Sequence, residues 1–562
     1  MNNKLCYSAL LGTALLFTGC GKKMNQFQAD YFKVNPNPLE VVGDKVPATV
    51  TGNIPGKFFQ KNAEVTVTPY LEYNGMELAS APYTFQGEKV RGNNPVVNYE
   101  TGGTVTIPVQ YVYVPEMQKS NLSLAFTVKQ GNKQYALPRV KVADGIVATA
   151  ALANVGTVHP AIAADKFQRV INEKFDADIK FLINQANIRD GELRTQAMKS
   201  LQNELQEANN DGRREIKEIN VTSYASPDGG VKLNTRLAEN REKNTVNYVE
   251  GQLKKENISD FGRLTADFTP QDWEGFKKLV AASNIQDKEL ILSVLSMYKD
   301  PEQREREIRN LSSIFDQLAE DILPKLRYSR ITASIDVIGK SDEEIQNIYK
   351  MNPKALSVDE LLYAATLTDD NDKRIQIYDT AASLYPEDFR PINNLGMCQF
   401  LDEDYDAAAA CFQQAAKLAP ESGEAQLNLG LVSLLNNNYK DATSRFGNAA
   451  GVPALGEALG VYYLKQGDYT SAIRAFGDAK TNNAALAQIL NKDYNKAKQT
   501  LGGIDYPDAT TYYIAAVLGA RTNNSDMVYN NLRESIKMDK NMAKLASNDL
   551  EFAKFNINSL VR

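Results

Sequence analysis

The residues whose types and spacing could do chemistry lie in one short stretch, from Ser226 to Arg241. A Gly-rich turn carries Ser226 and Asp228, and the helical pattern that follows carries Asn234 and Arg241. A guanidinium can hold a carboxylate through two parallel hydrogen bonds, and an aspartate on the turn supplies a complementary anion. The alternative is structural: Asn234 caps or turns into the helix, and Arg241 pairs with Glu242, Glu239 or a neighbouring strand end.

Alternating strands and helices must position this stretch, which predicts an α/β layer. A helical insertion at about 258–327 is expected to separate the last strand from the helix that carries Arg241. The expected elements are a strand at 178–183, a helix at 193–208, a strand at 218–224, a helix at 233–254 and a strand at 330–338.

The spacing of Gly229, Asn234 and Arg241 resembles the signature of the OmpA-like peptidoglycan-associated domain, in which Thr-Asp-x-x-Gly precedes Asn-x-x-Leu-Ser-x-x-Arg. The resemblance implies that an Asp and the Arg hold the zwitterionic diaminopimelate of the peptidoglycan stem peptide. Arg241 stands at the family's Arg position, but Ser226 stands at its Asp position and Asp228 follows two residues later. The peptidoglycan-binding candidates are therefore Arg241, Asp228, Asn234 and Ser226.

The N-terminus predicts the compartment. Lys4 precedes the apolar run 9–17, which is too short to span a bilayer, and Cys20 follows two small residues. This order resembles the lipobox of bacterial lipoproteins, which implies that residues 1–19 are removed and that Cys20 is lipidated. We expect an outer-membrane lipoprotein facing the periplasm, with 20–28 as its tether. The alternative is a plain secretory signal.

Residues 29–150 are rich in Val, Thr, Tyr and Pro, and they alternate in short runs. This pattern predicts an antiparallel β-sandwich that acts as a spacer. Pro69 and Pro108 lie within runs and favour edge strands or bulges. We interpret Tyr111 and Tyr113 as half-buried residues of the sandwich, the alternative being a carbohydrate platform.

Residues 341–562 repeat themselves. In three copies a Gly lies twelve residues before an Ala, and a Phe follows the Ala after four. This pattern resembles the tetratricopeptide repeat, in which small residues lie where two helices touch. The resemblance implies an all-α solenoid whose groove takes a protein partner. The packing residues are Gly396, Ala408 and Phe412 in one copy, Gly430, Ala442 and Phe446 in the next, and Gly460, Ala472 and Phe476 in the third.

These segments predict a multidomain α+β chain: the sandwich at 29–150, the OmpA-like domain at 151–340 and the repeats at 341–562. The net charge of −6 argues against a nucleic-acid partner. One His and four Cys disfavour a Cys/His metal site or nucleophile, and we expect Cys398 and Cys411 to be packed free thiols rather than a disulfide.

No motif singles out a pair of catalytic carboxylates. We therefore expect no enzyme activity, no cofactor and no metal, but an envelope scaffold that contacts the outer membrane, the peptidoglycan and a protein partner. One alternative is a subunit of a secretion, pilus or outer-membrane assembly machine that does not bind peptidoglycan. A cell-wall glycan hydrolase is the other.

Overall fold

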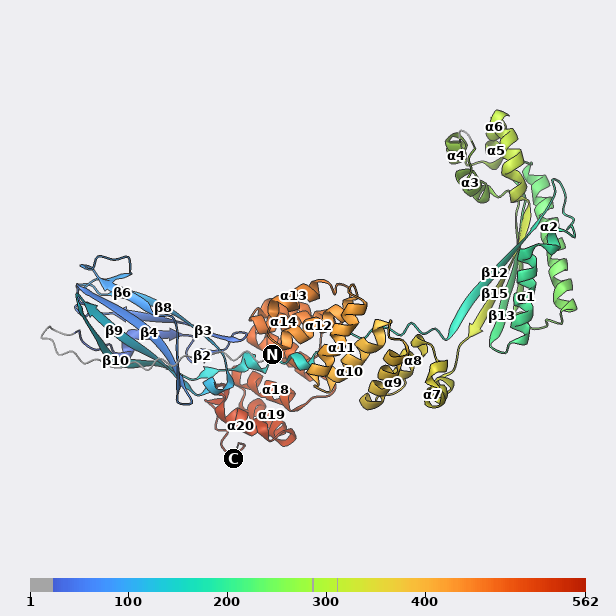
Figure 1. Ribbon diagram of the computed structural model, residues 1–562. Helices are drawn as coiled ribbons and strands as arrows, with labels where there is room; N and C mark the ends of the chain where they lie inside the picture. Colours follow the sequence, from blue (N-terminus) through green and yellow to red (C-terminus); the bar gives the residue numbers. More distant parts are fainter. Residues whose placement is uncertain (1–23, 286–287, 311, 562) are drawn as a thin grey trace. The chain divides into compact units, whose positions relative to one another are not determined.

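The computed structural model describes residues 24–285, 288–310 and 312–561, which form two compact units (Figure 1). One unit combines the chain up to Ala164 with the chain from Thr368 onward, and the other is Asp165–Leu367. These bounds differ from the expected ones at 151 and 341. The predicted signal peptide and lipidation site, Cys20 included, lie outside the described residues.

The N-terminal part of the first unit contains two large sheets around one core, as the alternating runs predict, and a short parallel pair of β2 (Leu39–Glu40) and β11 (Ile146–Val147). Val50 and Ile107 come from the smaller sheet and share a hydrophobic core with Val65 and Phe126 from the larger one. The smaller sheet has the order β1 (Phe32–Asn35), β3 (Lys45–Ile54), β8 (Gly103–Val112). The larger has the order β10 (Lys133–Asp144), β9 (Ser120–Gln130), β4 (Ala63–Tyr73), β6 (Tyr83–Gly87), β7 (Val96–Val97), with β5 (Met76–Ala79) beside β4.

The two prolines predicted to lie at edge strands or bulges differ in their position within the sheets. Pro108 lies on β8, which is an edge of the smaller sheet, as predicted. Pro69 lies on β4, which has neighbours on both sides, so the edge prediction is wrong there. The pairing of β4 with β6 ends at Val67 and its pairing with β5 begins at Tyr70, so the ring of Pro69 falls in the gap between two partners. Tyr111 is 3% exposed, which places it inside the sandwich.

The second unit contains a four-stranded sheet with two helices, α1 (Gln196–Asn210) and α2 (Val231–Lys255), on one face (Figure 1). Leu201 and Val249 of these helices pack on Ile219 and Ile331 of the sheet. The strand order is β12 (Val170–Lys180), β15 (Tyr328–Ile338), β13 (Arg214–Tyr224), β14 (Arg263–Thr269). The predicted alternation of strands and helices is therefore present.

The expected helical insertion at 258–327 begins later, because β14 lies inside that range and pairs in parallel with β13. None of the side chains of this strand is fully buried, but Leu264, Ala266 and Phe268 alternate with polar residues, which is a strand pattern that the prediction of a helical insertion did not take into account. The insertion itself consists of α3 (Trp273–Ala281), α4 (Lys288–Met297), α5 (Pro301–Asn310) and α6 (Ser312–Asp321). Beyond the sheet, α7 (Asp342–Met351) and α8 (Val358–Thr366) each begin with a capping box and belong to this unit rather than to the repeats.

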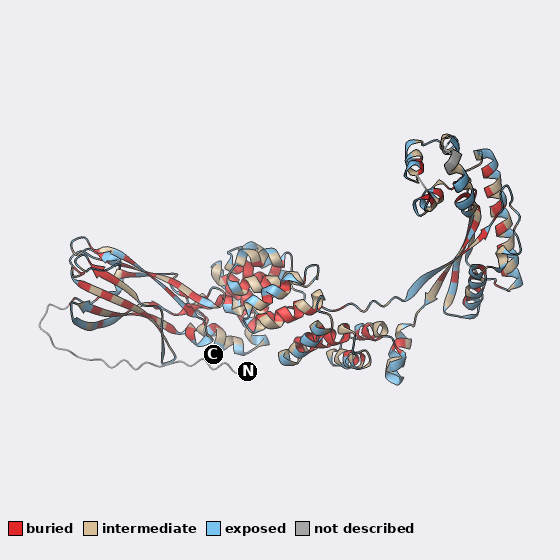
Figure 2. Cartoon of the chain, turned by 45° about the horizontal axis from the view of Figure 1, so that its top comes forward, coloured by how far each residue is buried: buried red, intermediate tan, exposed pale blue. Residues whose placement is uncertain are grey.

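The C-terminal part of the first unit is an all-helical array of paired helices. Its helices are α9 (Asn371–Leu384), α10 (Phe389–Leu401), α11 (Tyr405–Leu418), α12 (Gly423–Leu435), α13 (Tyr439–Gly447), α14 (Leu455–Gln466), α15 (Tyr469–Phe476), α16 (Asn482–Leu490), α17 (Tyr494–Gly502), α18 (Ala509–Arg521), α19 (Ser525–Met538) and α20 (Asn541–Asn548). Figure 2 shows their buried residues along the faces that meet.

The repeated glycines lie where a partner helix brings its phenylalanine. A Cβ on Gly396 would lie 2.8 Å from the ring of Phe412, and one on Gly430 would lie 2.5 Å from the ring of Phe446. The third copy pairs Gly460 with Phe476 in the same way, and Ala408, Ala442 and Ala472 are all fully buried. The repeated pattern thus reports close helix–helix packing.

The array joins the sheets through polar contacts as well as through its core. Arg521 Nη1 lies 3.8 Å from Glu40 Oε1, and the Tyr439 hydroxyl lies 3.4 Å from a carboxylate oxygen of Asp44. Cys398 and Cys411 are buried free thiols, as expected. Among the described residues, no helix is long and apolar enough to cross a membrane.

Candidate functional site

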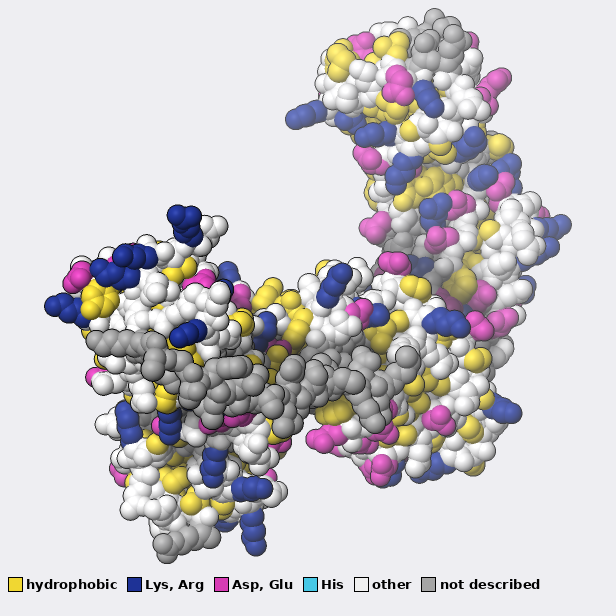
Figure 3. Space-filling view, turned by 60° about the vertical axis from the view of Figure 1, so that its left-hand side comes forward, with side chains coloured by type: hydrophobic (Ala, Val, Ile, Leu, Met, Phe, Trp, Pro, Cys, Tyr) yellow, Lys and Arg dark blue, Asp and Glu magenta, His cyan; other side chains and the backbone are white. Residues whose placement is uncertain are grey.

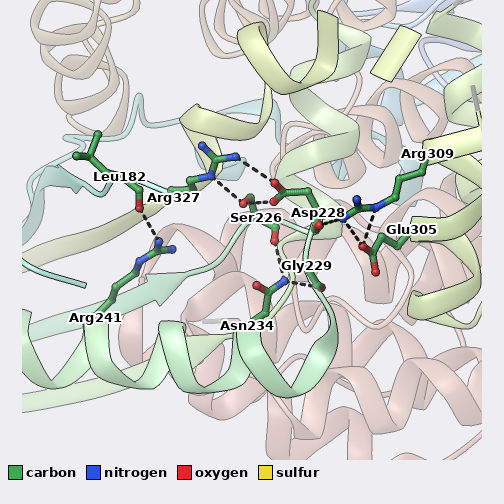
Figure 4. A network of polar contacts seen from close by, with 9 residues as sticks. All are labelled: Leu182, Ser226, Asp228, Gly229, Asn234, Arg241, Glu305, Arg309 and Arg327. Atoms are coloured by element: carbon green, nitrogen blue, oxygen red, sulfur yellow. Dashed lines mark hydrogen bonds and ion pairs between the residues drawn. The ribbon is translucent and has the colours of Figure 1, made fainter. Parts of the chain in front are cut away.

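The turn between β13 and α2 is closed by Asn234 (Figure 4). The Asn234 side-chain amide donates to the backbone oxygens of Ser226 and Gly229, both at 2.8 Å. A Cβ on Gly229 would lie 2.8 Å from Asn234 Oδ1, so the turn needs a residue without a side chain there. Asn234 is 4% exposed and therefore holds the turn rather than facing solvent.

Arg241 is buried, at 1% exposed, and binds the chain's own backbone. Its Nε donates to the carbonyl of Gln185 at 3.0 Å, its Nη1 to that of Tyr224 at 2.8 Å and its Nη2 to that of Leu182 at 3.3 Å. These carbonyls lie at the end of β13 and in the segment after β12. The guanidinium therefore ties two strand ends to α2. It also stacks over the Phe181 ring, 5.0 Å from its centroid.

Asp228, two residues after Ser226, is paired with Arg327 (Figure 4). Arg327 Nη2 donates to Asp228 Oδ2 at 3.1 Å, and Arg327 Nε donates to the Ser226 hydroxyl at 3.0 Å. The Ser226 hydroxyl donates in turn to the other oxygen of the Asp228 carboxylate. From α5, Arg309 donates to the backbone oxygen of Asp228, so the insertion packs over this turn.

No sequence pattern places Arg327 at this turn. It lies 101 residues beyond Ser226, immediately before β15, so no local spacing connects the two. Three guanidinium groups, those of Arg241, Arg327 and Arg309, thus contact this turn and its Asp228. Burial lowers the pKa of Arg241 to about 10; the nearby charge of Arg327 adds to this effect, and Asp228 opposes it.

These contacts define what the turn can do. Asn234 and Arg241 are buried and bind backbone carbonyls, and Ser226 is 5% exposed. Of the four predicted residues, Asp228 has the most accessible charge, with 17% of its side chain exposed, and it borders a small pocket. The pocket is lined by Pro227, Asp228, Trp273, Phe276, Glu305, Phe315, Leu318 and Leu323.

The repeats present a second candidate site, which already holds part of the chain. We define the repeat groove as the surface formed by the first helices α10, α12 and α16. Residues 153–164, which we call the groove segment, lie against these helices (cyan beside α10 and α12 in Figure 1). Val155, Val158 and Ala161 share one hydrophobic core with the repeats.

Asparagines bind the backbone of the groove segment. Asn394 Oδ1 accepts from the Ala163 N–H at 2.8 Å, and Asn394 Nδ2 donates to the Ala163 carbonyl at 2.9 Å. Asn428 binds both backbone groups of Ala161 in the same way, at 2.7 and 2.8 Å. Asn393 adds a donor to the Ala161 carbonyl at 3.1 Å and accepts from Asn428 Nδ2 at 3.0 Å.

Further along the array, Asn483 on α16 binds both backbone groups of Asn154, at 3.0 and 2.8 Å. Asn483 is 4% exposed, and Asn394 and Asn428 are at most 1% exposed. At the other end of the groove segment, Arg390 pairs with Asp388 at 2.7 Å and donates to the Ala164 carbonyl at 3.3 Å. The groove segment therefore runs antiparallel to the order of the repeats.

The sequence contained a signal for this site. Asn394 and Asn428 each lie two residues before the repeated Gly of their copy, at 396 and 430. Asn483 occupies the equivalent place in a later copy, two residues before Ala485. A buried side-chain amide needs hydrogen-bond partners. An asparagine that recurs at the same buried position of the first helix therefore indicates that the repeats bind the backbone of another segment.

No metal-binding group of His, Cys, Asp or Glu occurs among the described residues. Figure 3 shows Lys and Arg interspersed with Asp and Glu over the visible face. Within the part of the chain that the structure describes, the turn and the repeat groove are two places where polar side chains converge.

Comparison with known proteins identifies the repeats. The tetratricopeptide repeat family model matches residues 402–451, and no curated protein sequence matches the chain. A tetratricopeptide repeat protein from Parabacteroides merdae is 14% identical, covering 37% of this chain and 91% of its own, with a TM-score of 0.30. Pseudomonas aeruginosa pilF is 14% identical over 38% of this chain and 98% of its own, with a TM-score of 0.28.

A third solved structure, YrrB, a TPR protein with an unusual peptide-binding site, is 18% identical over 37% of this chain and 99% of its own, with a TM-score of 0.21. The C-terminal region of this chain therefore consists of tetratricopeptide repeats, the class of fold that the repeated glycines predict. Such repeats form protein–protein interaction scaffolds that bind segments in a groove.

Proposed function

We propose that the protein is a non-enzymatic scaffold of the bacterial envelope, held to the outer membrane by a lipid on Cys20. The observation that carries the scaffold role is the repeat array, which shares a compact unit with the N-terminal sheets. The lipobox resemblance of residues 9–20 supports the anchor. In this arrangement the sheets and repeats form the body of the scaffold, and residues 165–367 form its second module.

The anchor is tested by Cys20→Ala in cells. We expect the wild-type chain to fractionate with outer membranes and to incorporate a labelled fatty acid, and the variant to be released and unlabelled. Cys398→Ala serves as the matched control, because that thiol is buried within the repeats and should leave fractionation unchanged. Membrane retention of Cys20→Ala would contradict the anchor.

A second candidate function, contact with peptidoglycan through the module 165–367, is favoured by the charge at its turn. Arg309 pairs with Glu305 at 2.8 Å, which leaves the guanidinium groups of Arg241 and Arg327 beside one carboxylate, that of Asp228. A buried positive charge in excess is costly, and the carboxylate of a zwitterionic amino acid would neutralise it. Asp228, beside the pocket, is the group that would meet its ammonium.

Sedimentation of the full chain with purified peptidoglycan tests this contact. We expect the wild type to co-sediment, Asp228→Asn to weaken binding and Ser226→Asp to strengthen it. Arg263→Ala is the control, because that side chain is 78% exposed on the edge strand β14. A wild-type chain that stays in the supernatant would contradict peptidoglycan binding. It would favour a role as a structural subunit of an envelope secretion, pilus or outer-membrane assembly machine.

A further inference from the structure

We infer that residues 153–164 are a built-in peptide ligand of the repeats, so that the chain fills its own groove and closes it to outside peptides. This inference goes beyond the scaffold role, because it states what occupies the groove and what class of ligand fits it. It rests on contacts within the first compact unit.

The asparagines of the groove bind the backbone of the groove segment rather than its side chains. Asn394, Asn428 and Asn483 each bind the N–H and the carbonyl of a single residue, as a neighbouring β-strand would. All three side chains are buried beneath the groove segment, so their hydrogen bonds to its backbone form away from water, where such bonds are stronger. The site therefore suits a peptide backbone, and the chain itself supplies one.

Side-chain size restricts which peptide fits. Ala161 and Ala163 are 4% and 2% exposed, whereas Ile162 between them is 51% exposed and faces away. A Cβ on Gly156 would lie 2.2 Å from the hydroxyl of Tyr405, a stiff neighbour, so this position needs glycine. The ligand class is thus a segment with Gly, Ala or Val at the inward positions, which makes one 3-10 turn at Val155–Thr157 before it continues along the groove.

The groove segment is connected to the folded chain at both ends, which favours its binding over the binding of a separate peptide. Upstream, Ile146 and Val147 pair with β2 (Leu39–Glu40), and Thr149 donates to Glu551 near the C-terminus. Downstream, the chain continues into the second unit at Asp165. A tethered ligand binds at a high effective concentration, so a free peptide of equal intrinsic affinity is excluded. Protein partners of the repeats must use the surface outside the groove or displace the groove segment.

The test is a titration of the full chain with a fluorescein-labelled peptide of residues 149–164, followed by anisotropy. We expect no saturable binding to the wild type. In the variant Ala161→Glu/Ala163→Glu, two buried carboxylates expel the groove segment, and the peptide should bind with one-to-one stoichiometry. Adding Asn428→Ala to that variant should weaken binding by about tenfold, because one asparagine's pair of hydrogen bonds is lost.

Two results would overturn the inference. One is saturable binding of the peptide to the wild type, which would mean that the groove is open. The other is an absence of binding to the Ala161→Glu/Ala163→Glu variant when its circular dichroism shows intact helices.

If the Ala161→Glu/Ala163→Glu variant loses its helices, a labelling experiment tests whether the groove segment is bound. In a full chain with Cys6 and Cys20 replaced by serine, Ala161→Cys and Ile162→Cys differ only in which way the new thiol faces. We expect Ile162→Cys to react with a maleimide at least ~10-fold faster, because its side chain is exposed. Equal rates would show that the groove segment is not bound.

Discussion

Arg241→Ala should destabilise the second unit even though no ligand is involved. The substitution removes the donors to three backbone carbonyls, at Leu182, Gln185 and Tyr224. A buried acceptor left without a partner costs about 1–3 kcal/mol, and removal of a buried charge offsets part of this cost. We therefore expect the free energy of unfolding to fall by about 3 kcal/mol.

The assay is urea unfolding followed by fluorescence, because the chain contains a single Trp, Trp273, which lies in the second unit beside the turn. Arg263→Ala removes an exposed arginine from the same unit and should change stability by less than about 0.5 kcal/mol. A loss below about 1 kcal/mol for Arg241→Ala would refute the structural role assigned to its guanidinium. A loss near the predicted size would mean that weaker peptidoglycan sedimentation by this variant cannot be attributed to a lost ligand contact.

The remaining predictions concern the first unit. Gly430→Ala should cost about 1–3 kcal/mol in urea unfolding, because its Cβ would press on the ring of Phe446, whereas Gly447→Ala meets no atom within 4 Å and should be near neutral. Burial raises the pKa of Asp549, so the folded state binds its proton more readily than the unfolded state does between the ordinary Asp pKa and the raised one. The free energy of unfolding of the wild type should therefore rise relative to Asp549→Asn as the pH falls from 7 towards 4; the opposite trend would contradict this sign. Burial raises the pKa of the Cys398 and Cys411 thiols to about 11, so in a chain with Cys6 and Cys20 replaced by serine both should react with Ellman's reagent only after unfolding.

Local patterns predicted the repeat packing well. The spacing of Gly430, Ala442 and Phe446 reports contacts between two adjacent helices, and such contacts depend on residues close in sequence. The same holds for α1, β13, α2 and β15, whose boundaries agree with the predicted ones to within about four residues, whereas β12 begins eight residues before the strand predicted at 178–183. Periodicity is most informative where one side of an element is buried, as it is for these.

Contacts between residues far apart in the sequence could not be predicted from local patterns. The Arg327–Ser226 hydrogen bond joins residues 101 apart, and the Asn428–Ala161 bond joins residues 267 apart. The strand β14 is different, because Leu264, Ala266 and Phe268 alternate with polar residues, so its sequence does carry a strand pattern that the prediction of a continuous helical insertion did not take into account. The two long-range contacts depend on which elements the fold brings together, and for them only the recurring asparagines are visible in the sequence.

The idea that the repeats bind their own chain is tested most directly by hydrogen exchange of the full chain. The amides of Ala161 and Ala163 donate to Asn428 and Asn394, whereas the amide of Ile162 has no bonded acceptor among the described residues. We predict that Ala161 and Ala163 exchange as slowly as the helices α10 and α12 and that Ile162 exchanges quickly. Fast exchange at all three amides, with both helices still protected, would contradict the account.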